Sequence, residues 1–196
     1  QRLNAAAGDS LYRLPTEAEW EYSARAGTTT ALHNGPTTAD PHTCNLDAGL
    51  DAIGWYCGNS SSKTHSVGGK QSSSWDLFDM SGNVWEWVWD RYGDAYYGEQ
   101  VAALAGGADV DPQGPGSAPS PVLRGGSWND GVQDCRAAGR NWNSPGYRFD
   151  GLGFRPARSV LTAADLDLDH DGVCPHTDCA TPAPDTCHTV WNPDND

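Results

Sequence analysis

The chain has 196 residues and a formal net charge of −14, and it lacks the basic patch of a nucleic-acid-binding protein. Its apolar runs are all shorter than the roughly 18 residues of a membrane helix, so no transmembrane segment is expected. With 23 glycines and 13 prolines, loops and turns should outweigh regular structure, and 9 tryptophans compensate for a low aliphatic content.

Helices are predicted near the N-terminus. Residues 1–7 resemble the end of a helix, and a second helix is expected over residues 16–26. Thr16 followed three positions later by Glu19 forms a capping box, which favours a helix start at this point. Ala18, Tyr22 and Ala26 share one face of this helix, so we expect that face to pack against the core.

A long loop is predicted over residues 28–75, where short apolar islands alternate with serine-rich turns. A loop of this length needs a metal or a disulfide to pin it, and Asn45, Asp47 and Asp51 are candidate oxygen ligands. Six cysteines favour an extracytoplasmic protein, although the sequence leaves their pairing open. They are Cys44, Cys57, Cys135, Cys174, Cys179 and Cys187.

The stretch 79–89 combines Trp85, Trp87 and Trp89 with the acidic Asp79 and Glu86. On a solvated loop these tryptophans would expose a large apolar patch, so we expect the stretch to lie in the core. Buried carboxylates need a partner, a proton or a metal. The sequence therefore predicts that other parts of the chain satisfy the two acids.

The second half of the chain is predicted to contain little regular structure. Residues 94–120 should be irregular, and residues 129–151 are polar and rich in turn-forming residues. Strands are expected at 122–128 and 152–158. Pro156 would place the second strand at an edge or a bulge, because proline cannot donate to a sheet ladder.

Four segments together resemble the sulfatase-modifying factor superfamily, which includes the formylglycine-generating enzymes. They are residues 12–22 (YRLPTEAEWEY), 79–87 (DMSGNVWEW), 124–128 (RGGSW) and 152–155 (LGFR). The resemblance covers residues 1–160 and implies an α+β, C-type-lectin-like fold, which is loop-rich with few helices and a small twisted antiparallel sheet. Family members carry further strands before the first residue of this chain, so the N-terminal part of the fold is expected to be missing.

The resemblance also implies two calcium sites. The first would use side-chain and carbonyl oxygens of Asp79, Gly82, Val84 and Glu86. The second would use Asn45, the carbonyl of Leu46, Asp51 and the region of Ile53. Hard oxygen ligands of this kind suit Ca²⁺. The alternative for the first site is that Asp79 and Glu86 cap turns or pair with Arg13 or Arg155.

Formylglycine-generating members bind Cu⁺ with two cysteines five residues apart, and these positions fall on Asp130 and Cys135 here. A single thiol opposite a carboxylate cannot form a two-coordinate Cu⁺ centre, so the resemblance implies a non-catalytic domain. Cys135 is then expected to be a structural disulfide or a buried thiol. The alternative is a copper-dependent formylglycine-generating oxidase that acts on sulfatase cysteines.

Residues 124–155 are similar to the variable proteins of diversity-generating retroelements, in which the scaffold presents a ligand-binding surface. The matching positions are Asp130, Gly131, Val132, Gln133, Asn141, Trp142, Asn143, Ser144, Gly146, Tyr147, Phe149 and Asp150. Aromatic anchors among small polar residues suit recognition of a protein or a glycan. The alternative is a surface loop with a few packed aromatics, in a domain whose role is structural.

Residues 161–196 carry 8 aspartates and no Lys or Arg, and they resemble a thrombospondin type 3 calcium repeat. Alternating aspartates followed by a glycine turn can bring several carboxylates onto one cation. The candidate ligands are Asp167, Asp169, Asp171 and Asp178, and zinc on nearby histidines and cysteines is an alternative. Such repeats occur in extracellular proteins, so the sequence predicts a calcium-stabilised binding module that is secreted or held at the cell surface.

Overall fold

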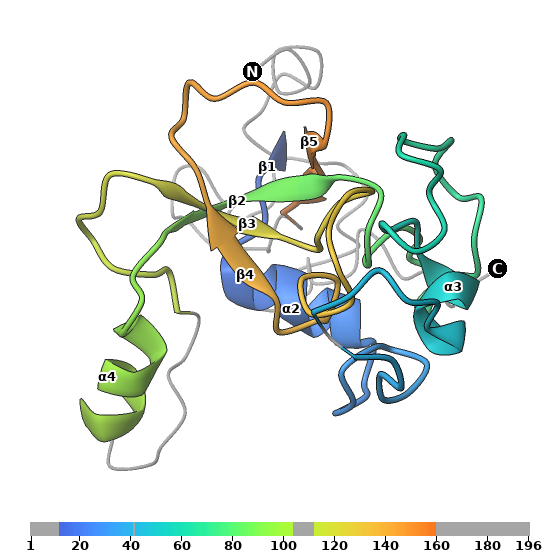
Figure 1. Cartoon of the computed structure of the whole chain (residues 1–196). Coiled ribbons are helices and arrows are strands. Elements are labelled where there is room, and N and C mark those ends of the chain that lie inside the picture. The colour runs from blue at the N-terminus through green and yellow to red at the C-terminus, as the bar shows by residue number, and fades with distance from the viewer. Residues whose placement is uncertain (1–11, 41, 104–111, 160–196) are drawn as a thin grey trace, which may run out of the picture. The chain divides into compact units, whose positions relative to one another are not determined.

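The computed structural model describes residues 12–40, 42–103 and 112–159 (Figure 1). The described residues fall into two compact units. The larger unit is Leu14–Pro156, and the smaller one contains β1 (Tyr12–Arg13), which pairs antiparallel with β6 (Ala157–Arg158). The predicted helix end at residues 1–7 and the predicted calcium ligands in residues 161–196 lie outside the described residues.

A four-stranded sheet in the order β4-β3-β2-β5 forms the centre of the larger unit. Its strands are β2 (Trp85–Arg91), β3 (Pro121–Arg124), β4 (Arg140–Trp142) and β5 (Leu152–Phe154). β3 is antiparallel to β2 and β4, but β5 is parallel to β2. The sheet is therefore mixed: the pairs β2–β3 and β3–β4 are antiparallel as predicted, and only the β2–β5 pair departs from the prediction. The reason is that residues 143–151 cross from the β4 edge to the β5 edge, and this crossover returns the chain in the same direction.

Helix α2 (Glu17–Arg25) begins at the predicted capping box. The Thr16 hydroxyl accepts a hydrogen bond from the Glu19 N–H (3.2 Å), and the Glu19 carboxylate accepts one from the Thr16 N–H (2.7 Å). The helix ends at Ala26, which adopts a left-handed conformation (φ 45°) as the C-cap. The local signals in the sequence thus set both ends of this helix to within a residue or two.

The predicted core-facing side of α2 was wrong for Tyr22, although Ala26 is buried as predicted. Within the helix Trp20 and Ala24 are the buried apolar residues, whereas Tyr22 is 68% exposed and packs in a tilted arrangement against Trp75 at 4.9 Å between ring centroids. The indole of Trp20 removes more apolar area from water than the Tyr22 ring, so it determines which side of the helix faces the sheet.

Two short helices occur where irregular structure was predicted. They are α3 (Ala48–Ile53) and α4 (Tyr96–Ala103). The Asp47 side chain caps α3 by accepting a hydrogen bond from the Leu50 N–H (2.9 Å). The same carboxylate also accepts hydrogen bonds from the Thr38 and Ala39 N–H groups (2.6 and 2.9 Å). Asp47 is therefore a buried capping residue that joins two parts of the long loop.

Strand β2 divides its residues between the two faces of the sheet. Val88 and Asp90 lie on the face that packs against α2, in a core that includes Trp20. Trp85, Trp87 and Trp89 lie on the opposite face, because successive side chains of a strand point to opposite sides. Trp85 is buried but Trp89 is 63% exposed, so the prediction that all three tryptophans are core residues was wrong for Trp89.

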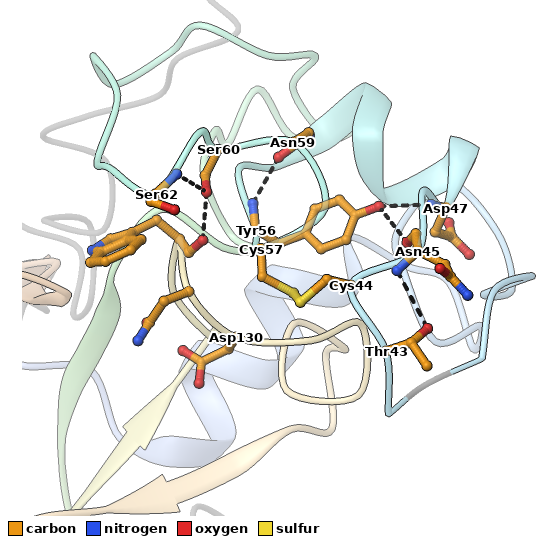
Figure 2. The surroundings of a disulfide bond; sticks show 12 residues. Thr43, Cys44, Asn45, Asp47, Tyr56, Cys57, Asn59, Ser60, Ser62 and Asp130 are labelled. Atoms are coloured by element: carbon orange, nitrogen blue, oxygen red, sulfur yellow. Dashed lines mark hydrogen bonds between the residues drawn. A yellow bond between two sulfur atoms is a disulfide. The ribbon is translucent and has the colours of Figure 1, made fainter.

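A disulfide between Cys44 and Cys57 pins the long loop, as the sequence predicted in general terms (Figure 2). Tyr56 reinforces this segment, since its hydroxyl donates to the Asn45 carbonyl (3.1 Å) and accepts from the Asp47 N–H (2.7 Å). The disulfide lies next to a second core cluster formed by Leu32, Leu50, Ile53, Tyr56, Val132 and Cys135. The loop over residues 28–75 is thus built around its own small core.

Candidate functional site

The turn at residues 79–84 is the first part of the candidate site. Asp79, Gly82 and Asn83 have positive φ angles of 57°, 84° and 65°. Gly82 is required because a Cβ atom at this position would lie 2.2 Å from the Trp55 carbonyl oxygen. This tight turn places Asp79 beside Val84 and Glu86, and all three line one open groove with a volume of about 480 Å³.

Asp79 has one satisfied and one unsatisfied carboxylate oxygen. Its Oδ2 accepts a hydrogen bond from the Gly68 N–H (2.7 Å), but its Oδ1 is buried and has no hydrogen-bond partner among the described residues. A buried carboxylate oxygen without a partner is costly unless a cation or a proton compensates it. This observation fits the predicted role of Asp79 as a calcium ligand.

Glu86 is buried and paired with Arg155. The Arg155 guanidinium donates to Glu86 Oε1 through Nη2 (2.8 Å) and to Oε2 through Nε (3.0 Å), and the Trp20 indole N–H donates to Oε2 (2.7 Å). The alternative considered for this acid, pairing with Arg155, is therefore present in the structure. Within the described residues Oε1 accepts a single hydrogen bond, which leaves one lone pair for a further ligand.

A metal ion in this turn would depend on backbone oxygens. Within residues 12–40, 42–103 and 112–159, no group of three or more His, Cys, Asp or Glu side chains could hold a metal ion. The predicted set combines only two side chains, from Asp79 and Glu86, with carbonyls of Gly82 and Val84. Asp79, Val84 and Glu86 line the same groove, and joint binding of one Ca²⁺ ion by the four residues stays a prediction.

The residues of the second predicted calcium site have other contacts. Asn45 is exposed, and its backbone is held by Thr43 and Tyr56. Asp51 accepts hydrogen bonds from the Asn59 side chain (2.7 Å) and from Lys70 Nζ (3.1 Å). Leu46 is exposed, and Ile53 is buried in the core cluster beside α3. The structure shows no contact that joins Asn45 to Asp51.

Asp130 lies at the position that the resemblance assigns to the first copper-binding cysteine. Its Oδ2 accepts hydrogen bonds from the Trp85 indole N–H (2.8 Å), the Ser127 N–H (3.0 Å) and the Ser127 hydroxyl. Its backbone carbonyl accepts the Cys57 N–H (3.0 Å), so the residue lies beside the disulfide (Figure 2). The carboxylate therefore has a structural role in the turn that follows β3.

Cys135 is a free thiol that is completely buried. Burial raises its pKa well above the usual value, and the nearby carboxylates of Asp130 and Asp134 raise it further. A thiol in such surroundings stays protonated, whereas a nucleophile or a soft-metal ligand must be a thiolate. This agrees with the prediction that Cys135 is a buried thiol.

The predicted ligand-binding positions are mostly accessible. Trp142, Tyr147 and Phe149 are 51%, 46% and 36% exposed, and Asn141, Ser144, Gly146 and Asp150 are exposed as well. Asp130, Gly131, Gln133 and Asn143 are half-buried. Val132 is completely buried in the core cluster of α3, so its prediction as a ligand contact was wrong. Its apolar side chain packs in that core and so holds the loop in place.

The exposed aromatics form two groups. Phe149 stacks on Trp128 (6.2 Å between centroids) and lies 6.5 Å from Tyr147, whereas Trp142 lies 6.2 Å from Tyr92. Aromatic side chains held against neighbours lose little conformational entropy when they bind a ligand. The surface from 141 to 150 thus offers two rigid apolar anchors separated by small polar residues.

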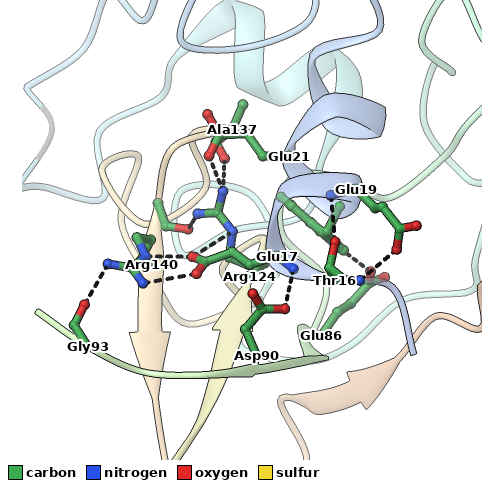
Figure 3. A network of polar contacts seen from close by, with 12 residues as sticks. Thr16, Glu17, Glu19, Glu21, Glu86, Asp90, Gly93, Arg124, Ala137 and Arg140 are labelled. Atoms are coloured by element: carbon green, nitrogen blue, oxygen red, sulfur yellow. Dashed lines mark hydrogen bonds and ion pairs between the residues drawn. The ribbon is translucent and has the colours of Figure 1, made fainter. Parts of the chain in front are cut away.

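A buried polar network, which the sequence did not predict, connects the strand under this surface to helix α2 (Figure 3). Arg140 on β4 donates to both oxygens of Glu17 (2.5 and 2.9 Å) and lies between Tyr92 and Tyr97, at 4.9 Å from each ring. The fully buried Arg124 lies 3.5 Å from the same carboxylate. The network therefore fixes β4, the strand that carries Trp142, to helix α2.

Asp90 belongs to the same network. Its Oδ2 accepts a hydrogen bond from the Glu17 N–H (2.7 Å), while its Oδ1 is buried without a hydrogen-bond partner in the part of the chain that the structure describes. Burial raises the pKa of Asp90 to about 6, and the charge of Glu17 contributes to this increase. The only signal in the sequence was the spacing of Glu86, Val88 and Asp90 at every second position, which places all three on one face of a strand.

Comparison with known proteins assigns residues 3–160 to the sulfatase-modifying factor enzyme 1-like domain. The chain is 36% identical over 154 residues to the formylglycine-generating enzyme of Streptomyces coelicolor, and the match covers 76% of this chain and 47% of that enzyme. Treponema denticola variable protein 1 is 40% identical with a TM-score of 0.61, covering 75% of this chain and 47% of that protein. PvdO from Pseudomonas aeruginosa is 28% identical with a TM-score of 0.62, covering 81% of this chain and 56% of that protein.

The chain spans about half the length of the first two of these relatives. The α+β architecture, with few helices and small sheets, agrees with the C-type-lectin-like fold that the sequence predicted. None of the helices in the described part of the chain is long and apolar enough to cross a membrane. On the matched residues and the shared fold, the chain belongs to the sulfatase-modifying factor enzyme 1-like family.

Proposed function

We propose that this chain is a non-catalytic, calcium-stabilised binding module that presents the surface 129–150 to a protein or glycan ligand. The observation that carries the proposal is the state of Asp130 and Cys135. The carboxylate is held by three hydrogen-bond donors from Trp85 and Ser127, and the thiol is completely buried. Neither group is available to bind Cu⁺ as a thiolate pair would.

Binding at the surface is supported by its construction. Trp142 and Tyr147 are exposed, yet each contacts another aromatic ring, and β4 is fixed by the Arg140–Glu17 ion pair. A pre-organised aromatic surface loses little entropy on binding. The similarity to a variable protein of Treponema denticola points in the same direction, since the resemblance identified in the sequence places ligand contacts in this segment.

Calcium is proposed as a stabilising ion. Asp79 and Glu86, with the carbonyls of Gly82 and Val84, would hold it in the turn that precedes β2. The unsatisfied Oδ1 of Asp79 supports this assignment. An ion at this position would neutralise buried negative charge and would supply no chemistry. The aspartates of residues 161–196 are proposed as further calcium ligands.

An extracytoplasmic location is proposed from the disulfide. Cys44 and Cys57 form a bond that closes a loop with a sequence separation of 13 residues. Structural disulfides persist in oxidising compartments and are rare in the cytosol. A secreted or surface-attached protein is also the setting in which a tail resembling a thrombospondin type 3 repeat would find calcium.

A copper-dependent formylglycine assay tests the absence of catalysis. The chain is incubated with Cu⁺, oxygen and a cysteine-containing sulfatase peptide, and the peptide mass is followed together with that of a reaction run with Cys135→Ser. No formylglycine is expected from either protein. Turnover that disappears in the Cys135→Ser protein would overturn the proposal and establish the oxidase alternative.

An array of glycans and peptides tests the binding role. A ligand selected on the wild-type chain should bind Trp142→Ala and Tyr147→Ala at least about tenfold more weakly, because truncation of an aromatic anchor typically costs more than 1 kcal/mol. An array with no signal above background would instead favour a structural domain.

A further inference from the structure

A second surface lies apart from the segment 129–150, and its shape follows strand β5. The groove of about 480 Å³ is lined by the consecutive residues 153–156, and facing them are residues 67–68 and 76–79. Of these four, Gly153 and Phe154 belong to β5, and Arg155 and Pro156 follow the strand directly. Successive residues of a strand point to opposite faces of a sheet, so a groove that touches both Gly153 and Phe154 runs along the edge of the strand. The end of β5 is therefore one wall of this groove.

The hydrogen-bond ladder determines which peptide groups of β5 face that edge. Trp85 pairs with Leu152 in the parallel register, and the Trp85 N–H donates to the Gly151 carbonyl (2.8 Å). In a parallel ladder Trp85 then bonds to the residues on either side of Leu152, and the N–H and C=O groups of Leu152 itself point away from β2. The Leu152 N–H accordingly donates to the Phe149 carbonyl (3.2 Å). Phe154, two positions further along, has the same orientation, so its N–H and C=O groups point away from β2.

Among the strands of the described residues, β5 lies at an edge, since the sheet order ends at β5. An edge with outward-pointing peptide groups is a template on which another extended chain can add as a strand. Apolar side chains border the edge, because Phe154 is 66% exposed and Val67 and Phe78 are exposed across the groove. These positions can contact the alternate side chains of an added strand.

The charges in the groove indicate what such a segment should carry. Glu86 is neutralised by its ion pair with Arg155. Asp76 is exposed on the opposite wall, and Asp79 adds a second carboxylate deeper in the groove. Asp76 is not among the proposed calcium ligands, so the groove keeps a negative charge at its rim with or without the ion. A basic side chain complements this charge.

We propose that the edge of β5 is a docking site for an extended peptide segment that alternates apolar residues and carries a lysine or arginine opposite Asp76. Backbone hydrogen bonds to Phe154 would supply affinity, and contacts with Phe154, Phe78 and Asp76 would supply specificity. The proposal does not rest on the binding role of the surface 129–150.

Selection from a random-peptide phage library on the intact chain tests this proposal. Selected peptides should alternate apolar residues and contain a basic one. They should bind Phe154→Ala about tenfold more weakly, as truncation of an aromatic anchor does. Asp76→Asn should also weaken binding and reduce its salt dependence; asparagine tolerates the positive φ of this position (56°), so this variant should fold. Trp89→Ala is the matched control, because it removes an aromatic of similar exposure outside the groove.

Synthetic peptides identify the backbone contacts. N-methylation of alternate amides should abolish binding in one register and leave it intact in the other, because only one set of N–H groups faces the edge. Equal binding by both N-methylated forms, no enrichment in the library, or no effect of Phe154→Ala would overturn the proposal. Sedimentation equilibrium adds one more outcome. A dimer that dissociates on Phe154→Ala would assign the edge to a second copy of the chain and also overturn it.

Discussion

The buried carboxyl of Asp90 should make the stability of this domain depend on pH in a way that one substitution removes. Asp90 is 1% exposed, and burial raises its pKa from 3.8 to about 6. A carboxyl whose pKa is raised by folding stabilises the folded state when protonated. This contribution is complete below about pH 4 and is lost as the pH rises through about 6.

The magnitude follows from the same values. A pKa difference of one corresponds to about 1.4 kcal/mol, so the increase to about 6 amounts to about 3 kcal/mol between pH 4 and pH 7. Asp90→Asn removes the titrating group and keeps an oxygen that can accept the Glu17 N–H. The free energy of unfolding of the variant, relative to wild type, should therefore rise by about 3 kcal/mol over this interval.

Urea denaturation of both proteins across this pH range measures the difference directly. Other groups titrate in both proteins, so their effects cancel in the comparison, and the values at pH 4 act as the internal reference. Unfolding curves whose difference stays constant with pH would refute the reasoning. That result would mean that the Asp90 carboxyl is compensated by Arg140 or by water more fully than its unpartnered Oδ1 indicates.

Other predictions concern the metal, the network and the loop. Calcium at 100 times its dissociation constant should stabilise the folded chain by about 2.7 kcal/mol, measured by thermal melts. If the turn at 79–86 binds the ion, EDTA or Asp79→Asn should remove this gain. Identical melts in all conditions would exclude a calcium site in this turn. Glu17→Gln should lower the free energy of unfolding in urea by about 3–5 kcal/mol, because the fully buried Arg124 would lose the carboxylate that faces its Nε. A decrease below about 1 kcal/mol would contradict this expectation. A double serine variant that lacks the Cys44–Cys57 bond should lose about 3 kcal/mol of unfolding free energy, which a lower midpoint of urea denaturation would show. An unchanged midpoint would show that Asp47 alone holds the loop.

Local features of the fold could be predicted from the sequence. The start of α2 depends on two residues three positions apart, Thr16 and Glu19, whose side chains and backbone satisfy each other. Strand β2 was identified as a structured segment because its tryptophans alternate with Glu86 and Val88. In both cases the deciding interactions lie within a few residues, so the sequence pattern contains them.

Features that depend on distant contacts could not be predicted. Arg140 meets Glu17 across 123 positions of the chain, and no local pattern links a strand arginine to a helix glutamate. The same limit explains Trp89 and Tyr22, whose exposure depends on which neighbours cover each face of β2 and α2. The buried position of Val132 likewise follows from the core around α3, a helix too short to produce a detectable period.

Asp130 shows why membership of this family does not establish an activity. Its carboxylate satisfies the indole N–H of Trp85 and the N–H of Ser127, so it completes the turn after β3. A cysteine at this position would leave the Trp85 donor without a strong acceptor. It would also leave Cys135 as buried as before, and burial is the main cause of that thiol's raised pKa. A copper site would therefore need a repacked turn as well as a second thiol, so the shared scaffold alone does not determine the chemistry.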